Sequence, residues 1–227
     1  SADSTAHASY RNGLLEGLTT RVASPEAAFA DTVAVLLAQH HFRARPWTAG
    51  VIDEMDLGRS LRIYRDRMAD AGDFTFYFVG NVDAAALRPL VCSYLASLPA
   101  TGRRETWRDV GMQLPVGVTE RVVRRGVEPK SRTRLIFVGD EQWSYDRALA
   151  LDGLADVLRI KLREVLREDL GGTYGVGVSA SLVQYPRGAY SLAVGFGCAP
   201  ERADEMTAAL TRGLRSLTMD DLAAEIG

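Results

Sequence analysis

The chain has few of the residues that form metal sites or disulfide frameworks. Its 227 residues include three histidines, His7, His40 and His41, and two cysteines, Cys92 and Cys198. No HExxH, HxxEH or CxxC motif can be drawn from them, so the sequence indicates neither a zinc site nor a disulfide-stabilised domain. We expect the His40-His41 pair to end a helix, where imidazolium complements the helix dipole. Both cysteines lie in apolar stretches, which predicts buried free thiols.

The chain also lacks a dominant charge and a long apolar run. Lys and Arg number 27 against 29 Asp and Glu, and no apolar run approaches the roughly 20 residues that span a bilayer. The basic stretch RVVRRGVEPKSRTR has no interleaved stacking aromatics, and its charges fit the solvated face of a strand. No GxSxG setting or phosphate loop is present. We therefore expect no nucleic-acid partner and no membrane partner.

What the chain does have is a composition that supports a sizeable core, with 47% hydrophobic residues. Ser24 and Pro25 open an amphipathic helix, PEAAFADTVAVLLAQH, and a second helical pattern follows in VIDEMDLGRSLRIYRDRMADA. The run DFTFYFVGNVD predicts a strand. A helix, DAAALRPLVCSYLASLP, comes next, with Asp83 as its cap and Pro99 at its close.

The second half contains more strands. After an irregular stretch over residues 100–117, the runs VTERVVRRG and RTRLIFVGD predict strands, and YDRALALDGLADVLRIKLREVLRED predicts a long helix. Two strands joined by QYPRG and a final helix, PERADEMTAALTRGLRSL, complete the order. Adjacent strand pairs favour an α+β class: two layers, with a mostly antiparallel sheet and helices packed on one face.

One stretch, LREDLGGTYGVGVSA, places Arg167 and Tyr174 on the two sides of a helix-to-strand turn. Two interpretations of the pair stay open. In the first, Arg167 forms a surface salt bridge with Glu164 or Glu168, and Tyr174 is an ordinary strand aromatic. In the second, the guanidinium and the phenol converge as two donors that grip a peptide carbonyl or stabilise an oxyanion.

A series of motifs runs through the chain from about Arg45 onward. It consists of FTFYFVGNVDAAALRPLVCSYLASLP, a connector, EPKSRTRLIFVGD, a long helix ending LREVLREDLGGTYGVGVSAS, and PERADEMTAALTRGL. In order and spacing the series resembles the pitrilysin and insulin-degrading-enzyme family of zinc peptidases, and most of all its bacterial pitrilysin-like zinc proteases. In the terms of that family, residues 1–99 are the end of one α+β unit, 100–117 a connector, and 118–227 the beginning of the next unit, truncated in its last helix.

The resemblance implies a function for the turn. In this family one half carries the HxxEH zinc motif, whose zinc-bound water attacks the peptide carbonyl, and the metal-free half supplies an arginine and a tyrosine. The matching residues here are Arg167 and Tyr174, as oxyanion-stabilising and substrate-orienting groups. The following strand would hold extended peptide, with Gly172, Gly175, Val176 and Gly177 as substrate-binding positions. An alternative interpretation is that the glycines only permit turn geometry and strand bending.

The absence of HxxEH further implies that this chain is a piece of the metal-free half of a zinc metalloendopeptidase and is inactive alone, with zinc bound elsewhere in the polypeptide. Its opening, SADSTAH, and its end, DDLAAEIG, are consistent with an excised piece. The expected partners are an unfolded polypeptide or peptide substrate and the zinc-bearing half, and open sheet edges would permit a homo-oligomer of the fragment. The family favours a periplasmic or secreted bacterial protein. The alternatives are a non-catalytic structural module of the same fold and an unrelated α+β binding domain.

Overall fold

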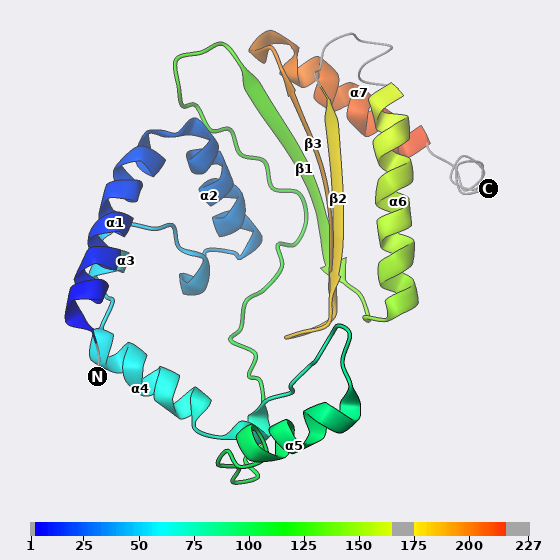
Figure 1. Cartoon of the computed structure of the whole chain (residues 1–227). Helices are drawn as coiled ribbons and strands as arrows, with labels where there is room; N and C mark the ends of the chain where they lie inside the picture. Colours follow the sequence, from blue (N-terminus) through cyan, green and yellow to red (C-terminus); the bar gives the residue numbers. More distant parts are fainter. Residues whose placement is uncertain (1–2, 165–174, 217–227) are drawn as a thin grey trace. The chain divides into compact units, whose positions relative to one another are not determined.

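The computed structural model describes residues 3–164 and 175–216 of the chain (Figure 1). By internal contacts the chain divides into two compact units. The first comprises Ser1–Asp31 and Arg45–Arg108, and the second comprises Thr32–Ala44 and Asp109–Gly227. The expected division into family units at residues 99 and 118 stays a prediction. Among the described helices, none is long and apolar enough to cross a membrane.

The helices of the N-terminal half begin at side chains that accept backbone hydrogen bonds. They are α1 (Ser4–Ala23), α2 (Pro25–Leu37), α3 (Ala49–Asp53), α4 (Leu57–Met68) and α5 (Ala84–Tyr94). The Ser24 hydroxyl accepts from Ala27 N–H at 3.2 Å before α2, and Asp83 accepts from Ala85 N–H at 2.8 Å before α5. These caps satisfy amide groups that have no partner inside the helix, which confirms both expected helix starts.

Three expectations for this half were incomplete or wrong. Helix α1 was not predicted. The helical pattern over residues 51–71 is interrupted after α3, because Asp56 accepts from Arg59 N–H at 2.6 Å and starts α4 as a new helix. Cys92 is exposed on α5, whereas Cys198 is buried as expected. An apolar neighbourhood in sequence does not bury a thiol when the whole helix has no buried residue.

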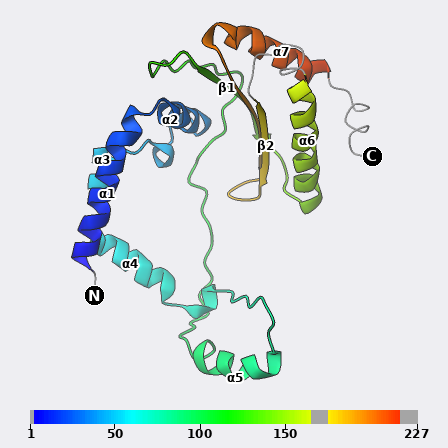
Figure 2. The same ribbon diagram turned by 45° about the horizontal axis from the view of Figure 1, so that its top comes forward.

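The second unit contains a three-stranded antiparallel sheet in the order β1-β3-β2. The strands are β1 (Ser131–Asp140), β2 (Val176–Val183) and β3 (Ala189–Cys198). Val194 on β3 lies opposite both Leu135 on β1 and Val178 on β2. Figures 1 and 2 show α6 (Tyr145–Arg163) and α7 (Ala203–Ser216) on the same side of this sheet. The α+β class, with an antiparallel sheet and helices on one face, is confirmed.

One face of the sheet and the two helices enclose the core. Alternate strand residues point into it, including Val176, Val178, Val194 and Phe196. From the helices come Leu158 and Leu162 on α6, and Met206 and Leu210 on α7. The start of β1 alternates, because Arg132 and Arg134 are exposed while Ser131, Thr133 and Leu135 are partly buried. The hairpin between β2 and β3 is therefore fixed by burial of one of its faces.

Two of the expected strands are absent from the described structure. Neither residues 74–79 nor residues 118–126 are strands, although both have the composition of one. A strand exists through hydrogen bonds to a neighbouring strand, and neither segment has such a neighbour among the residues described. These two predictions are wrong for this structure, and the reason is the missing neighbour rather than the local sequence.

Candidate functional site

Strand β2 is the outermost strand of the described sheet on one side, and it directly follows the turn that the sequence singled out. Its only pairing in the described part of the chain is with β3, from Val176 opposite Phe196 to Val183 opposite Ala189. Its other edge therefore carries the backbone groups of an edge strand. Such an edge can take an extended peptide as an additional strand, through main-chain hydrogen bonds.

The turn itself lies outside the described residues. Arg167, Gly172 and Tyr174 all fall within residues 165–174, so the structure does not describe whether the arginine and the tyrosine come together. It does describe the two elements on either side of the turn. Helix α6 ends at Arg163 and β2 begins at Val176, and the two elements pack against each other through the core.

A further arginine joins these two elements. Arg159 Nη2 on α6 donates a hydrogen bond of 3.2 Å to the carbonyl oxygen of Val178 on β2, and its Nη1 pairs with Asp156 at 2.8 Å. This bond crosses from helix to strand a few residues before and after the turn. Arg159 was not predicted as a site residue, because a single arginine within a helix carries no local signal of a bond to a strand.

The three other expected site positions are described, and they differ from one another. The Val176 side chain is 7% exposed and belongs to the core, so it can offer a ligand only its backbone. Gly175 and Gly177 are exposed. An added Cβ at Gly175 would meet nothing within 4 Å, and at Gly177 it would meet only the Gly195 carbonyl oxygen, at 3.9 Å. Packing within the described chain therefore does not require glycine at either position.

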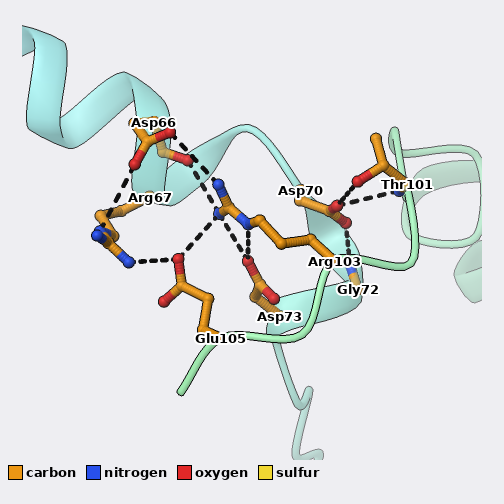
Figure 3. Close-up of polar contacts among 8 residues, drawn as sticks. All are labelled: Asp66, Arg67, Asp70, Gly72, Asp73, Thr101, Arg103 and Glu105. Carbon is orange, nitrogen blue, oxygen red and sulfur yellow. Dashed lines mark hydrogen bonds and ion pairs between the residues drawn. The ribbon is translucent and has the colours of Figure 1, made fainter. Parts of the chain in front are cut away.

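A second polar cluster lies in the first unit, between the end of α4 and residues 101–105 (Figure 3). Asp70 is 3% exposed, and its carboxylate accepts from the Thr101 hydroxyl, from Gly72 N–H at 2.8 Å and from Thr101 N–H at 3.0 Å. Led by the Thr101 hydroxyl, these donors lower the pKa of Asp70 to about 2. A carboxyl that stays ionised and fully bonded is a poor general acid or base at neutral pH, so this group has a structural role.

Arg103 completes that cluster. Its Nε donates to Asp73 at 2.8 Å, and its Nη2 donates to the Asp66 carbonyl oxygen, near the end of α4, at 3.0 Å. Glu105 bridges Arg103 and Arg67. Hydrogen bonding to Asp73 raises the pKa of Arg103 above its ordinary value. The start of the expected connector is therefore anchored to the first unit.

The side chains of the described residues do not fit a zinc ion. Across residues 3–164 and 175–216, no group of three or more His, Cys, Asp or Glu side chains is arranged to hold a metal. The three histidines are spread over α1 and the segment after α2, where His41 Nε2 lies 3.0 Å from the Val110 carbonyl oxygen. His40 lies just beyond the end of α2, as expected.

Comparison with known proteins gives one family match, to the peptidase M16 inactive domain over residues 59–226. The chain is 26% identical over 145 residues to "Probable zinc protease PqqL" of Haemophilus influenzae, which covers 63% of this chain and 15% of that protein. It is 23% identical over 207 residues to "Zinc protease PQQL-like" of Arabidopsis thaliana, and this alignment covers 84% of this chain and 21% of that protein. The chain thus spans about a fifth or less of either relative.

Solved structures share the fold. The periplasmic protease PqqL from Escherichia coli superposes with a TM-score of 0.80 at 22% identity, over 96% of this chain and 24% of that one. A mutant of the ferredoxin protease FusC in complex with Arabidopsis ferredoxin superposes with a TM-score of 0.74 at 18% identity, over 99% of this chain and 25% of that one. A peptidase M16 inactive domain from Pseudomonas fluorescens superposes with a TM-score of 0.66 at 16% identity, over 98% of this chain and 55% of that one.

Proposed function

Because the chain belongs to the peptidase M16 inactive-domain family, we propose that it is the metal-free part of a zinc metalloendopeptidase and contributes substrate-binding groups to a site on another domain. The family match over residues 59–226 carries this proposal, since it includes both the turn and strand β2. The relatives described as zinc proteases are several times longer than this chain. That difference leaves room in a longer polypeptide for a zinc-bearing part.

Arg167 and Tyr174 are the groups that would act on the substrate. A guanidinium and a phenol are both donors, and each can donate to a carbonyl oxygen that becomes negatively charged when the peptide bond is attacked. Donors placed in advance at that oxygen stabilise the transition state more than the bound substrate, so they raise turnover. The loss of one such donor typically costs about 100- to 1000-fold in turnover.

Strand β2 would hold the extended substrate beside these donors. Gly172, Gly175 and Gly177, with the backbone of Val176, form the proposed contact. The support lies in the two described glycines, which are exposed and which packing within the chain does not require. A glycine that packing within the chain does not require leaves space for the backbone of a bound peptide to approach closely.

An unfolded polypeptide or peptide is the substrate class that fits an open strand edge, because main-chain hydrogen bonds read extended backbone rather than particular side chains. The FusC structure, which shares this fold, contains a protein partner, ferredoxin. Zinc has no fitting ligand set among the described residues, so the proposal assigns it to the remainder of the polypeptide.

The test is peptide turnover by the longer polypeptide that contains this chain. Arg167→Ala and Tyr174→Phe should each lower kcat about 100-fold or more on an unstructured fluorogenic peptide, at an unchanged melting temperature. Arg163→Ala is the matched control, since Arg163 is an exposed arginine four residues earlier in the sequence, at the end of α6. If both variants turn over like the wild type, the proposal fails, and a non-catalytic structural module of the same fold becomes the better description.

A further inference from the structure

Two arginines of β1 lie on the face of the sheet that is turned away from α6 and α7 (Figures 1 and 2). Leu135 packs against the core between sheet and helices, and successive side chains of a strand point to opposite faces, so Arg134 projects from the other face. Arg132, two residues earlier, shares that face. Both arginines are exposed, and neither forms an ion pair with any described residue. They therefore present positive charge that the described part of the chain does not neutralise.

The strand register aligns both arginines with glycines. Arg134 lies opposite Gly195 on β3, and Gly195 lies opposite Gly177 on β2. Arg132 lies opposite Gly197. Apart from its chain neighbours, an added Cβ at any of these three glycines would meet within 4 Å only a backbone carbonyl oxygen, at 3.5 or 3.9 Å. Between Arg134 and the outer edge of β2, this face of the sheet is therefore bare backbone.

Nothing else on this face of the described strands offers the arginines a free carboxylate. The Asp140 carboxylate, at the end of β1, pairs with Arg187 Nε at 3.3 Å. Before β1, Glu128 pairs with Lys130 at 2.8 Å. The other residues on this face of β2 and β3 are uncharged: Ser179, Ser181, Val183, Ala189, Ser191 and Ala193.

The bare rows bring Arg134 within reach of a peptide at the outer edge of β2. Neighbouring strands are about 4.8 Å apart, so such a peptide would lie about 14 Å from β1. An arginine side chain that crosses the glycine row covers about half of that span, and a glutamate side chain on the peptide covers about a quarter of it. The remaining gap is about 4 Å, the separation of an ion pair. A larger residue at Gly195 or Gly177 would obstruct this path.

We propose that Arg134, assisted by Arg132, selects acidic side chains in the extended peptide that binds along β2. The inference rests on the proposed function, because it needs a peptide at that edge, and it adds the chemical class of peptide that the edge prefers. Main-chain hydrogen bonds alone accept any extended sequence, whereas charges placed beside the edge favour one class of side chain. Every second side chain of the bound peptide would face the arginines, so acidic residues at alternate positions are the best match.

A nucleic acid is the competing anionic ligand. Single-stranded nucleic acids bind where positive charge is combined with aromatic side chains on which bases stack. This face of the described strands carries no aromatic residue. A peptide with carboxylates is therefore the better match to the arginines and the strand edge together.

Binding of two labelled peptides to the longer polypeptide tests the inference, with zinc chelated so that neither peptide is cut. The peptides have the same length and differ only at alternate positions, where one carries Glu and the other Gln. The wild type should bind the Glu peptide about 5-fold more tightly in low salt, and added salt should weaken this preference. Arg134→Glu should abolish it. Arg212→Glu makes the same charge change at an exposed residue of α7, on the other side of the sheet, and should keep it.

Gly195→Val gives a second measurement that leaves both arginine charges in place. Valine suits a strand, and its side chain would occupy the surface between Arg134 and the edge, so the preference for the Glu peptide should largely disappear. Ser191→Val is the control, because Ser191 lies on the same face of β3 in a row without arginine, opposite Val138. Equal binding of both peptides by the wild type, or a preference that survives in Arg134→Glu, would overturn the inference.

Turnover by the zinc-loaded polypeptide separates this inference from the proposed function. If the Gln peptide is cut in a manner that depends on Arg167 and Tyr174, while the Glu peptide is bound no more tightly, only the inference fails. Binding of neither peptide would refute the proposed function and the inference together. Tight binding of a single-stranded oligonucleotide that displaces the Glu peptide and is lost in Arg134→Glu would also overturn the inference and assign the arginines to a nucleic acid.

Discussion

The Arg159 guanidinium on α6 and the Val178 carbonyl on β2 are joined by a hydrogen bond of 3.2 Å, which ties together the two elements that flank residues 165–174. Arg159 also pairs with Asp156, one turn earlier on the same helix. The first contact links helix to sheet, whereas the second stays within the helix. The link matters because an edge strand has a neighbouring strand on only one side to hold it.

Arg159→Ala should therefore destabilise the second unit by about 0.5–1.5 kcal/mol, the usual contribution of one such hydrogen bond. Asp156→Ala removes only an exposed pair within the helix and should cost about 0.2–0.5 kcal/mol. Urea unfolding of the two variants beside the wild type measures both changes. Equal effects in the two variants would mean that the bond to Val178 contributes nothing of its own.

The lowered pKa of Asp70 predicts that the protein loses stability in acid. Its folded pKa of about 2 lies below the ordinary value of 3.8, so the ionised, hydrogen-bonded carboxylate stabilises the fold above pH ~4. That contribution disappears as the pH falls toward the folded pKa. Asp70→Asn should thus be less stable than the wild type at pH 7, because its amide cannot accept from both Gly72 and Thr101 in the same way.

The measurement is urea unfolding of the wild type and Asp70→Asn at several pH values between 7 and 2. The gap between the two proteins should narrow steadily below about pH 5. Asp152→Asn, an exposed position on α6, serves as the control and should track the wild type throughout. A gap that stays constant down to pH 2 would refute the assigned role of the carboxylate charge.

Gly188, in the turn between β2 and β3, has no space for a side chain. An added Cβ would lie 2.2 Å from the Glu141 carbonyl oxygen, and Glu141 N–H donates to the Gly188 carbonyl at 3.1 Å. Two backbone segments meet there, so neither can move away freely. Gly188→Ala should destabilise the chain by about 1–3 kcal/mol, as overpacking does in other interiors.

Gly153→Ala is the matched comparison for that prediction. Gly153 lies within α6, and nothing lies within 4 Å of an added Cβ. Alanine should therefore stabilise the helix by up to about 1 kcal/mol. Thermal unfolding of both variants tests the pair, and a stabilising Gly188→Ala would show that the two segments are not held together as described.

Local signals predicted much of this fold. Ser24 and Asp83 mark the starts of α2 and α5 because a capping side chain satisfies nearby amides whatever the tertiary structure. The two runs joined by QYPRG predicted the hairpin of β2 and β3, and burial of one face of that hairpin holds its register.

Elements that depend on distant partners could not be predicted in this way. Residues 74–79 and 118–126 have strand composition, but a strand also requires a neighbour. The apolar residues of helix α1 are spread around the helix and form no apolar stripe that would reveal it. For the candidate site, the sequence indicated Gly175, Val176 and Gly177 on a strand, and the structure shows that this strand lies at an edge of the described sheet. It gave no sign of Arg159, whose hydrogen bond to β2 depends on how the helix packs on the sheet.

The proposed function requires that this chain supply donors to a zinc peptidase site without binding the metal. The most direct test is to measure zinc content and peptide turnover on the same preparations of the longer polypeptide, as wild type, Arg167→Ala and Tyr174→Phe. We predict unchanged zinc content in all three, with kcat lowered about 100-fold or more in the two variants. Loss of zinc in step with activity, or wild-type turnover in both variants, would contradict the claim.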